Sequence, residues 1–234
     1  MKEFLIGFAI LCAYFIVCAT TALILRKTVH IPDEVFRKIL HFILLSSLFI
    51  FVFAFKTWWI SALTCGLIIL LAYPVLFFFE RFKSFSSVMT ERKQGEIRLS
   101  LIVVFLTFAA VIGLCWGLFR DKVIVLAVIF AWGYGDAAAA LIGSKFGKRK
   151  IYRKKTLEGT LAMAVTAFVT VFLILILHGI VPWYGTLVTS ILVAAAVAVV
   201  ELFTHDGFDT VTCPLTALVV MTPLLYAFGG ILNG

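Results

Sequence analysis

Long apolar runs follow one another along almost the whole chain, with short charged connections between them. A helix that crosses about 30 Å of hydrocarbon needs about 20 apolar residues, so each run is a candidate transmembrane helix. No stretch alternates as a strand does. The sequence therefore predicts an all-α integral membrane protein with about eight transmembrane helices, seven being possible because the second and sixth runs are short. The predicted spans are Phe4–Leu25, Ile39–Phe55, Trp58–Phe79, Leu99–Phe119, Val123–Ile142, Leu161–Leu177, Trp183–Phe203 and Val211–Ile231.

The composition supports the same class of protein. Hydrophobic residues make up 63% and charged residues 14% of the 234 residues, whereas a soluble domain has roughly 25% charged residues. The apolar runs leave no room for a separate soluble domain, so we expect residues 1–234 to form one membrane domain. We assign the net charge of +8 to membrane topology and not to nucleic-acid binding. The five cysteines lie in apolar runs without a CxxC pair, which argues against zinc and disulfides.

The first apolar run is predicted to be a retained helix and not a signal peptide. Its apolar core is longer than the roughly 7–15 residues of a signal peptide, and Arg26 and Lys27 follow where a cleavage site would lie. We expect residues 1–27 to form a peripheral first helix.

Lysine and arginine residues collect on alternate connections. Sixteen of the twenty lie within 26–38, 81–98 and 145–155. Because short cytoplasmic loops carry an excess of these residues, the pattern predicts that these connections are cytoplasmic and that the N-terminus lies outside. Ten of the twelve acidic residues fall on the same inner face, and only Glu3 and Asp121 fall outside.

Two of the inner acids, Asp136 and Glu201, lie inside predicted spans, near the inner ends. An ionised carboxylate is costly at that depth and is usually functional. The alternative is a carboxylate that is held by a neighbouring Lys or Arg, or one that reaches the interface. Two such acids beside a basic connection favour an active site at the cytoplasmic face.

The connection that follows Asp136 combines glycines with cations. Glycines let backbone N–H groups approach an anion, cations bind phosphates, and Mg²⁺ binds through one or two carboxylates together with phosphate oxygens. These features predict a nucleoside triphosphate site with Mg²⁺ at the membrane surface. The glycine spacing is not that of a P-loop, and a loop that only adheres to anionic lipid would leave the acids unexplained. The connection contains Gly143, Gly147, seven Lys or Arg residues within Lys145–Lys155, Thr156, Glu158 and Gly159.

The stretch "GDAAAALIGSKFGK", followed by "KKTLEGT", resembles the glycine-aspartate, glycine-lysine and lysine-threonine/serine-x-glutamate-glycine pattern of the polyprenol kinase family. That family contains dolichol kinases, phytol kinases and CTP-dependent diacylglycerol kinases, and it is related to the phosphatidate cytidylyltransferases. The stretch "ELFTHDGFDTVTCPL" looks like the late segment of the family at Glu201, Asp209 and Pro214, with Thr210 in place of the usual asparagine. The resemblance extends over about residues 35–232. Weaker matches are Arg37 and Lys38 with His41, and Gly95 with Glu96.

The resemblance implies a membrane kinase that transfers the γ-phosphoryl group of CTP, or of another nucleoside triphosphate, to the hydroxyl of a polyprenol, phytol or diacylglycerol. Such a transfer depends mainly on positioning the phosphates and neutralising their charge, which Mg²⁺ and cations supply. The expected Mg²⁺ ligands are Asp136, Asp209 and Glu201. The expected nucleotide contacts are Lys145, Gly147, Lys148, Lys155 and Thr156.

The expected catalytic residues are Asp136, Glu158, Asp209 and His41. Three roles stay open for Glu158: it accepts the substrate proton, it holds a metal, or it caps the sixth helix if that helix starts at Thr156. Two roles stay open for His41, which is either a base for the lipid hydroxyl or an amphipathic anchor at the interface.

Other functions would leave a different pattern. A lipid cytidylyltransferase would use the same CTP and Mg²⁺ chemistry, but its usual late motif has no good counterpart after Glu201. A secondary transporter would more often place acids near the midplane with inverted repeats or broken helices, neither of which is evident. A scaffold protein would not explain the clustered acids. From the compact length and the lack of a targeting extension, we expect a prokaryotic cytoplasmic membrane.

Overall fold

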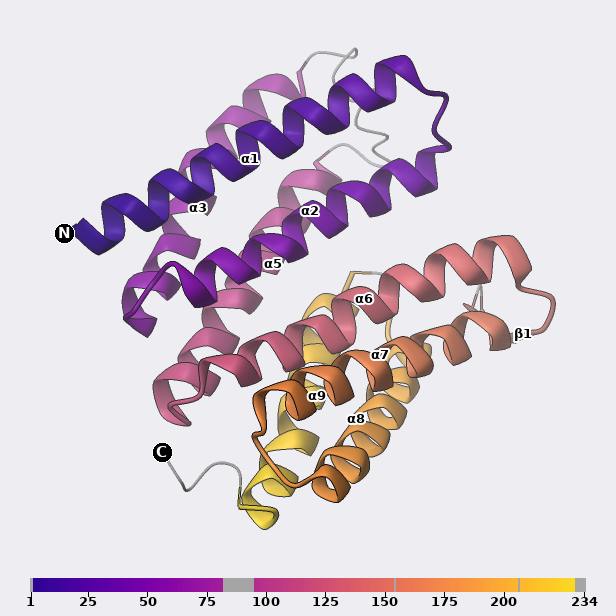
Figure 1. Ribbon diagram of the computed structural model, residues 1–234. Coiled ribbons are helices and arrows are strands. Elements are labelled where there is room, and N and C mark those ends of the chain that lie inside the picture. Colours follow the sequence, from indigo (N-terminus) through magenta and orange to yellow (C-terminus); the bar gives the residue numbers. More distant parts are fainter. Residues whose placement is uncertain (1, 82–94, 154, 206, 230–234) are drawn as a thin grey trace. The chain divides into compact units, whose positions relative to one another are not determined.

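The structure is a computed structural model that describes residues 2–81, 95–153, 155–205 and 207–229. Within these ranges, eight helices are long and apolar enough to cross a membrane, which confirms the predicted all-α, multi-pass architecture. In chain order (Figure 1), the elements are α1 (Lys2–Thr28), α2 (Asp33–Phe53), α3 (Trp58–Phe79), α5 (Glu96–Val111) with the π-helix η1 (Ile112–Leu118), α6 (Lys122–Phe146), the strands β1 (Lys150–Tyr152) and β2 (Lys155–Thr156), α7 (Leu157–His178), α8 (Trp183–Phe203) and α9 (Asp209–Ala227).

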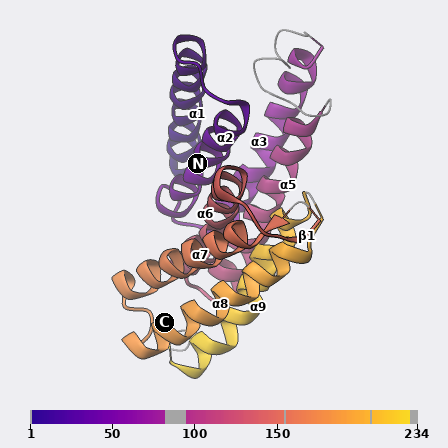
Figure 2. The same ribbon diagram turned by 90° about the vertical axis from the view of Figure 1, so that its right-hand side faces the viewer.

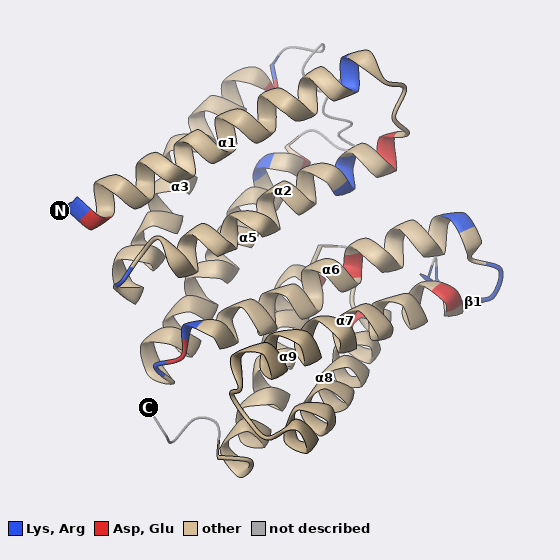
Figure 3. Ribbon diagram, in the orientation of Figure 1, with Lys and Arg blue, Asp and Glu red and all other residues tan. Residues whose placement is uncertain are grey.

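Several helices continue beyond the predicted apolar runs into charged sequence. α2 begins at Asp33 instead of Ile39, and α6 ends at Phe146 instead of Ile142. Figure 3 shows Lys, Arg, Asp and Glu gathered mainly near the helix ends, while most of each helix carries other residues. Some predicted features lie outside the described residues: the cations Lys83, Arg92, Lys93 and Lys154, the acids Glu91 and Asp206, and the end of the last predicted span.

The chain divides into two compact units, Met1–Ala110 and Val111–Gly234. The first unit contains α1, α2, α3 and α5, and the second contains η1 and the helices from α6 to α9. The prediction of one membrane domain over the whole chain, with a peripheral first helix, stays a prediction.

Aromatic rings fill the interior of the first unit. Phe51 of α2 packs edge-on against Phe105 and Phe108 of α5, with ring centroids 5.9 and 6.3 Å apart. Phe15 of α1 meets Phe105 in the same geometry at 6.2 Å. Because edge-to-face ring pairs are favourable beyond the area that they bury, these contacts join α1, α2 and α5.

The two acids predicted on the outer side, Glu3 and Asp121, both bind the beginning of a helix. Glu3 accepts hydrogen bonds from the backbone N–H groups of Lys56 and Thr57, just before α3, with N···O distances of 2.6 and 2.9 Å. Asp121 is the N-cap of α6 and accepts from the N–H group of Val123 at 2.7 Å. A carboxylate at a helix N-terminus satisfies donors that lack a partner within the helix and interacts favourably with the helix dipole. Both acids are therefore structural.

Asp121→Ala is expected to lower the free energy of unfolding by about 1 kcal/mol, because alanine cannot accept hydrogen bonds from the first turn of α6. The control is Asp121→Asn, since asparagine caps a helix about as well as aspartate. Titration of the purified protein with SDS, followed by circular dichroism, measures both variants. An unchanged unfolding midpoint in Asp121→Ala would contradict the capping role.

In the second unit, α6 and α7 lie side by side and approach each other closely. Small residues recur every four positions on α6, at Gly135, Ala139 and Gly143. A Cβ atom added to Gly159 of α7 would lie only 3.0 Å from the carbonyl oxygen of Ala139. Small residues of this kind let two membrane helices pack backbone to backbone. α8 packs against α7, and α9 packs against both α8 and α6 (Figures 1 and 2), so the unit is a four-helix bundle.

A short hairpin between α6 and α7 was not predicted from the sequence. β1 and β2 pair antiparallel, with Lys150 opposite Thr156 and Tyr152 opposite Lys155. Arg153 in the turn has a left-handed backbone with φ of 51°. Strands of three and two residues are too short for an alternating pattern to be recognised, and they leave the all-α architecture unchanged.

Candidate functional site

Three glycines surround Thr156 at the beginning of α7. A Cβ atom added to Gly143 would lie 3.2 Å from Thr156 Oγ1, and one added to Gly147 would lie 2.7 Å from Thr156 Cγ2. Thr156 is the N-cap of α7, because its Oγ1 accepts from the N–H group of Gly159 at 3.2 Å. We call the segment Gly143–Gly159 the clamped connection. Close contacts at both ends of this segment leave little room for a residue larger than glycine.

Glu158 closes the clamped connection from the α7 side. Its Oε2 accepts hydrogen bonds from the backbone N–H groups of Lys148 and Arg149, at 3.1 and 3.3 Å. A capping box requires the acid at the third helical position, which is Gly159 when Thr156 is the N-cap, so Glu158 does not form one. Glu158 therefore holds the connection against α7, and its assignment as a catalytic residue stays a prediction.

Lys155 and Glu201 form an ion pair between β2 and α8. Lys155 Nζ lies 2.8 Å from Glu201 Oε1 and also donates to the backbone carbonyl oxygen of Glu201. The sequence left two explanations open for Glu201, a functional carboxylate or one that a neighbouring cation holds, and this contact corresponds to the second. Phosphate binding by Lys155 and metal binding by Glu201 both stay predictions, and both would compete with this ion pair.

A ring contact joins the same two elements. Tyr152 of β1 packs edge-on against Phe203 of α8, with ring centroids 5.4 Å apart. Neither residue was singled out from the sequence, because the contact spans 51 positions and aromatic residues are frequent throughout the chain. The hairpin is thus attached to the last turn of α8 by one ionic and one aromatic contact.

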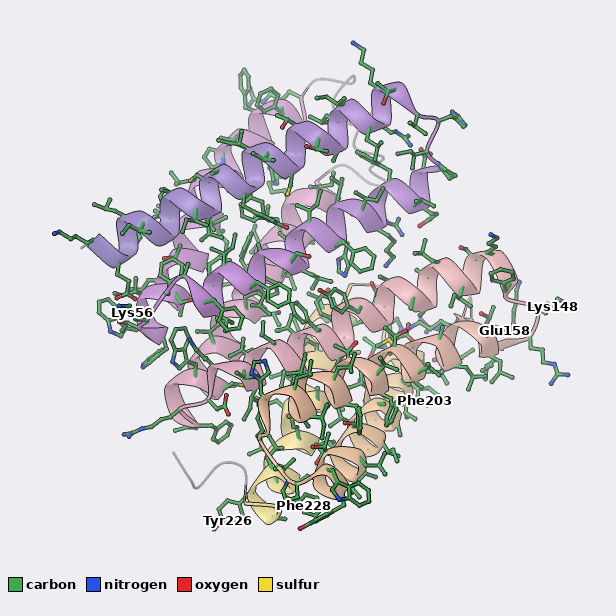
Figure 4. All side chains as sticks on the ribbon, in the orientation of Figure 1. Lys56, Lys148, Glu158, Phe203, Tyr226 and Phe228 are labelled. Carbon is green, nitrogen blue, oxygen red and sulfur yellow. The ribbon has the colours of Figure 1, made fainter. Side chains whose placement is uncertain are left out.

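Four cations between the end of α6 and the first residue of the hairpin face outward. Lys145, Lys148, Arg149 and Lys150 are all exposed, and none of these four exposed cations forms an ion pair with a residue that the structure describes. The Lys145 ammonium lies 5.3 Å from the ring centroid of Phe146. Figure 4 labels Lys148 and Glu158 at this end of α6 and α7. The clamped connection therefore presents a concentrated positive charge on a fixed backbone, which suits a multiply charged anion.

The acids predicted as metal ligands come from three helices of the second unit, α6, α8 and α9. Asp136 lies in α6, is half-buried and has the buried neighbours Gly135 and Ala137. Because α6 continues to Phe146, Asp136 lies about 15 Å from the end of its helix at about 1.5 Å per residue. Asp209 is the first residue of α9, and its Oδ1 accepts from the N–H group of Gly207 at 3.2 Å.

These acids do not form a ready-made metal centre. In the described part of the chain, no three His, Cys, Asp or Glu side chains gather closely enough to hold a metal ion. Mg²⁺ that is bound together with phosphate oxygens needs only one or two protein carboxylates. Asp136 and Asp209 each supply a carboxylate of the kind that this donor set requires, and Glu201 forms an ion pair with Lys155.

His41 lies on α2, in the first unit. On the same helix, Arg37 Nη2 lies 2.7 Å from Glu34 Oε2, and Lys38 is buried. The catalytic role of His41 stays a prediction, because the candidate site is built from residues of the second unit.

Comparison with known proteins gives no relative. No family model, no curated protein and no solved structure matches the chain. The resemblance to polyprenol kinases therefore depends on the quoted residues alone, and membership of that family stays a prediction.

Proposed function

We propose that the protein transfers a phosphoryl group from a nucleoside triphosphate, CTP foremost, to the hydroxyl of a lipid alcohol. The clamped connection is the observation that carries this proposal. It is fixed by glycine contacts and by Glu158, and it presents the four exposed cations directly before the N-terminus of α7. Cations and a helix N-terminus together favour a bound polyphosphate.

The other predicted residues have defined tasks in this proposal. Lys145 and Lys148 bind and orient the phosphates, and Thr156 keeps a hydroxyl proton to donate while its oxygen caps α7. Asp136 and Asp209 would hold Mg²⁺, which supplies positive charge at the phosphate oxygens when it is bound. Asp136 also receives the lipid hydroxyl at headgroup depth, since it lies within a membrane span and not in a loop.

The proposed orientation places this chemistry at the cytoplasmic face of the membrane, where nucleoside triphosphates are found. A prokaryotic cytoplasmic membrane stays the expected location. The acceptor is a polyprenol, phytol or diacylglycerol, whose apolar chain remains in the bilayer while its primary hydroxyl reaches the protein.

Transfer of label from γ-³²P-CTP to a panel of these alcohols tests the proposal. The assay uses the purified protein in detergent with Mg²⁺, and α-³²P-CTP and γ-³²P-ATP are run in parallel. We expect label to move from the γ position to at least one alcohol. Label that moves only from the α position, onto phosphatidate or another lipid phosphate, would identify a cytidylyltransferase instead. No transfer from any donor would reject both enzyme classes.

A further inference from the structure

The Lys155–Glu201 ion pair joins two residues that the proposed chemistry gives to other partners. An ammonium group has three N–H donors. Two acceptors around Lys155 Nζ belong to Glu201: the carboxylate oxygen Oε1 at 2.8 Å and the backbone carbonyl oxygen. In this arrangement, most of the hydrogen-bonding capacity of Lys155 is directed at one residue of α8.

The pair is sheltered from water. The side chains of Lys155 and Glu201 are 23% and 9% exposed. Partly buried charges are screened only weakly, and removing one partner leaves the other uncompensated. An anion that reaches Lys155 therefore competes with the Glu201 carboxylate for the same ammonium group.

The ring contact connects this exchange to the position of the hairpin. Tyr152 lies opposite Lys155 in the paired strands, and it packs on Phe203, two residues after Glu201. The ionic and aromatic contacts thus hold neighbouring positions of the hairpin on the same turn of α8. Separation of Lys155 from Glu201 therefore loosens the attachment of the hairpin to α8.

We propose that Glu201 is an internal competitor for the anion that Lys155 binds, so that the hairpin stays closed on α8 until a polyphosphate displaces the carboxylate. The choice of a polyphosphate as the ligand rests on the proposed function, but the inference concerns binding and not transfer. It gives Glu201 a role opposite to that of a metal ligand. Loss of its charge strengthens binding of the polyphosphate instead of weakening it.

A double-mutant cycle tests the competition directly. The probe is inorganic tripolyphosphate, titrated by calorimetry into the purified full-length protein in detergent with EDTA, so that no divalent metal contributes. We expect Glu201→Gln to lower the Kd about tenfold and Lys155→Gln to raise it about tenfold. The double variant should bind as Lys155→Gln does, because the competitor acts only through Lys155.

Two further variants separate competition from general charge effects. Glu34→Gln removes one negative charge next to Arg37 in the first unit, and we expect its Kd to stay within about twofold of the wild type. Phe203→Leu removes the ring contact without changing the charge, and we expect it to lower the Kd about twofold to threefold. SDS titration of each variant checks that a changed Kd does not come from unfolding.

Several results would overturn the inference. The first is a Kd of Glu201→Gln that is unchanged or higher than that of the wild type. The second is an equal decrease in Kd when Glu201→Gln is added to Lys155→Gln. The third is that neither the wild type nor Glu201→Gln binds tripolyphosphate. Different results would reject the kinase proposal. A protein that shows the expected cycle but transfers no label supports the competition alone, and a lipid kinase without the cycle retains its function and loses the internal competitor.

Discussion

Gly147→Ala is expected to destabilise the second unit by about 1–3 kcal/mol, the usual cost of forcing an extra carbon into a packed site. The new Cβ atom would lie 2.2 Å from the carbonyl oxygen of Gly143 and 2.8 Å from Thr156 Oγ1. The first contact is with backbone, which cannot rotate away as a side chain can. Either the end of α6 or the N-cap of α7 must shift, so binding of tripolyphosphate should also weaken. SDS titration and calorimetry measure the two effects.

The matched control is Gly66→Ala. Gly66 lies in α3, and a Cβ atom added there meets nothing within 4 Å. We expect this variant to be neutral or slightly stabilising, since alanine favours a helix over glycine by about 1 kcal/mol. If Gly147→Ala unfolds at the same SDS concentration as Gly66→Ala, the close contact around Thr156 does not limit stability.

Asp136→Asn is expected to reduce label transfer from γ-³²P-CTP by about 10²–10³-fold at saturating Mg²⁺, the range found when one group that stabilises the transition state is removed. Asparagine keeps the size of the side chain and loses its charge. The expected loss follows from the proposal that this half-buried carboxylate of α6 helps to neutralise the phosphates through Mg²⁺. Because the folded structure should be retained, the unfolding midpoint in SDS should change little.

Asp121→Asn makes the same chemical change at the other end of α6 and is the control for Asp136→Asn. Asparagine at position 121 still caps α6, so we expect label transfer within about twofold of the wild type. If Asp136→Asn transfers label at a near-normal rate, the proposal that Asp136 is a Mg²⁺ ligand is wrong, and Asp136 is only a polar residue of the helix.

The spans were predictable from the sequence because the length of an apolar run is a local property. Eight runs became eight candidate membrane helices in the described part of the chain. The helix ends were less predictable, since the decisive groups are polar. α2 begins with Asp33 and Glu34, which are favourable at a helix N-terminus, whereas hydropathy alone places the start at Ile39.

The candidate site was only partly predictable. The glycines and Thr156 come together because they lie within one connection of the chain. The partner of Glu201 was not identified from the sequence, because Lys155 is 46 positions away and several cations of the connection are chemically equivalent. The structure identifies Lys155, in the second strand of the hairpin, as the cation that pairs with Glu201 of α8.

Close packing along α6 and α7 has a consequence for the affinity of any ligand at the clamped connection. Ordering one residue of a flexible loop costs about 1–2 kcal/mol of conformational entropy. Where helices meet as closely as at Ala139 and Gly159, most of that loss has already occurred during folding, and a ligand meets a preorganised backbone. Substitutions in the contact between α6 and α7, at Gly135 or Ala139, should therefore weaken binding at the aqueous surface without touching the ligand. Nucleotide affinity at this connection depends on helix packing inside the membrane as well as on the charges outside it.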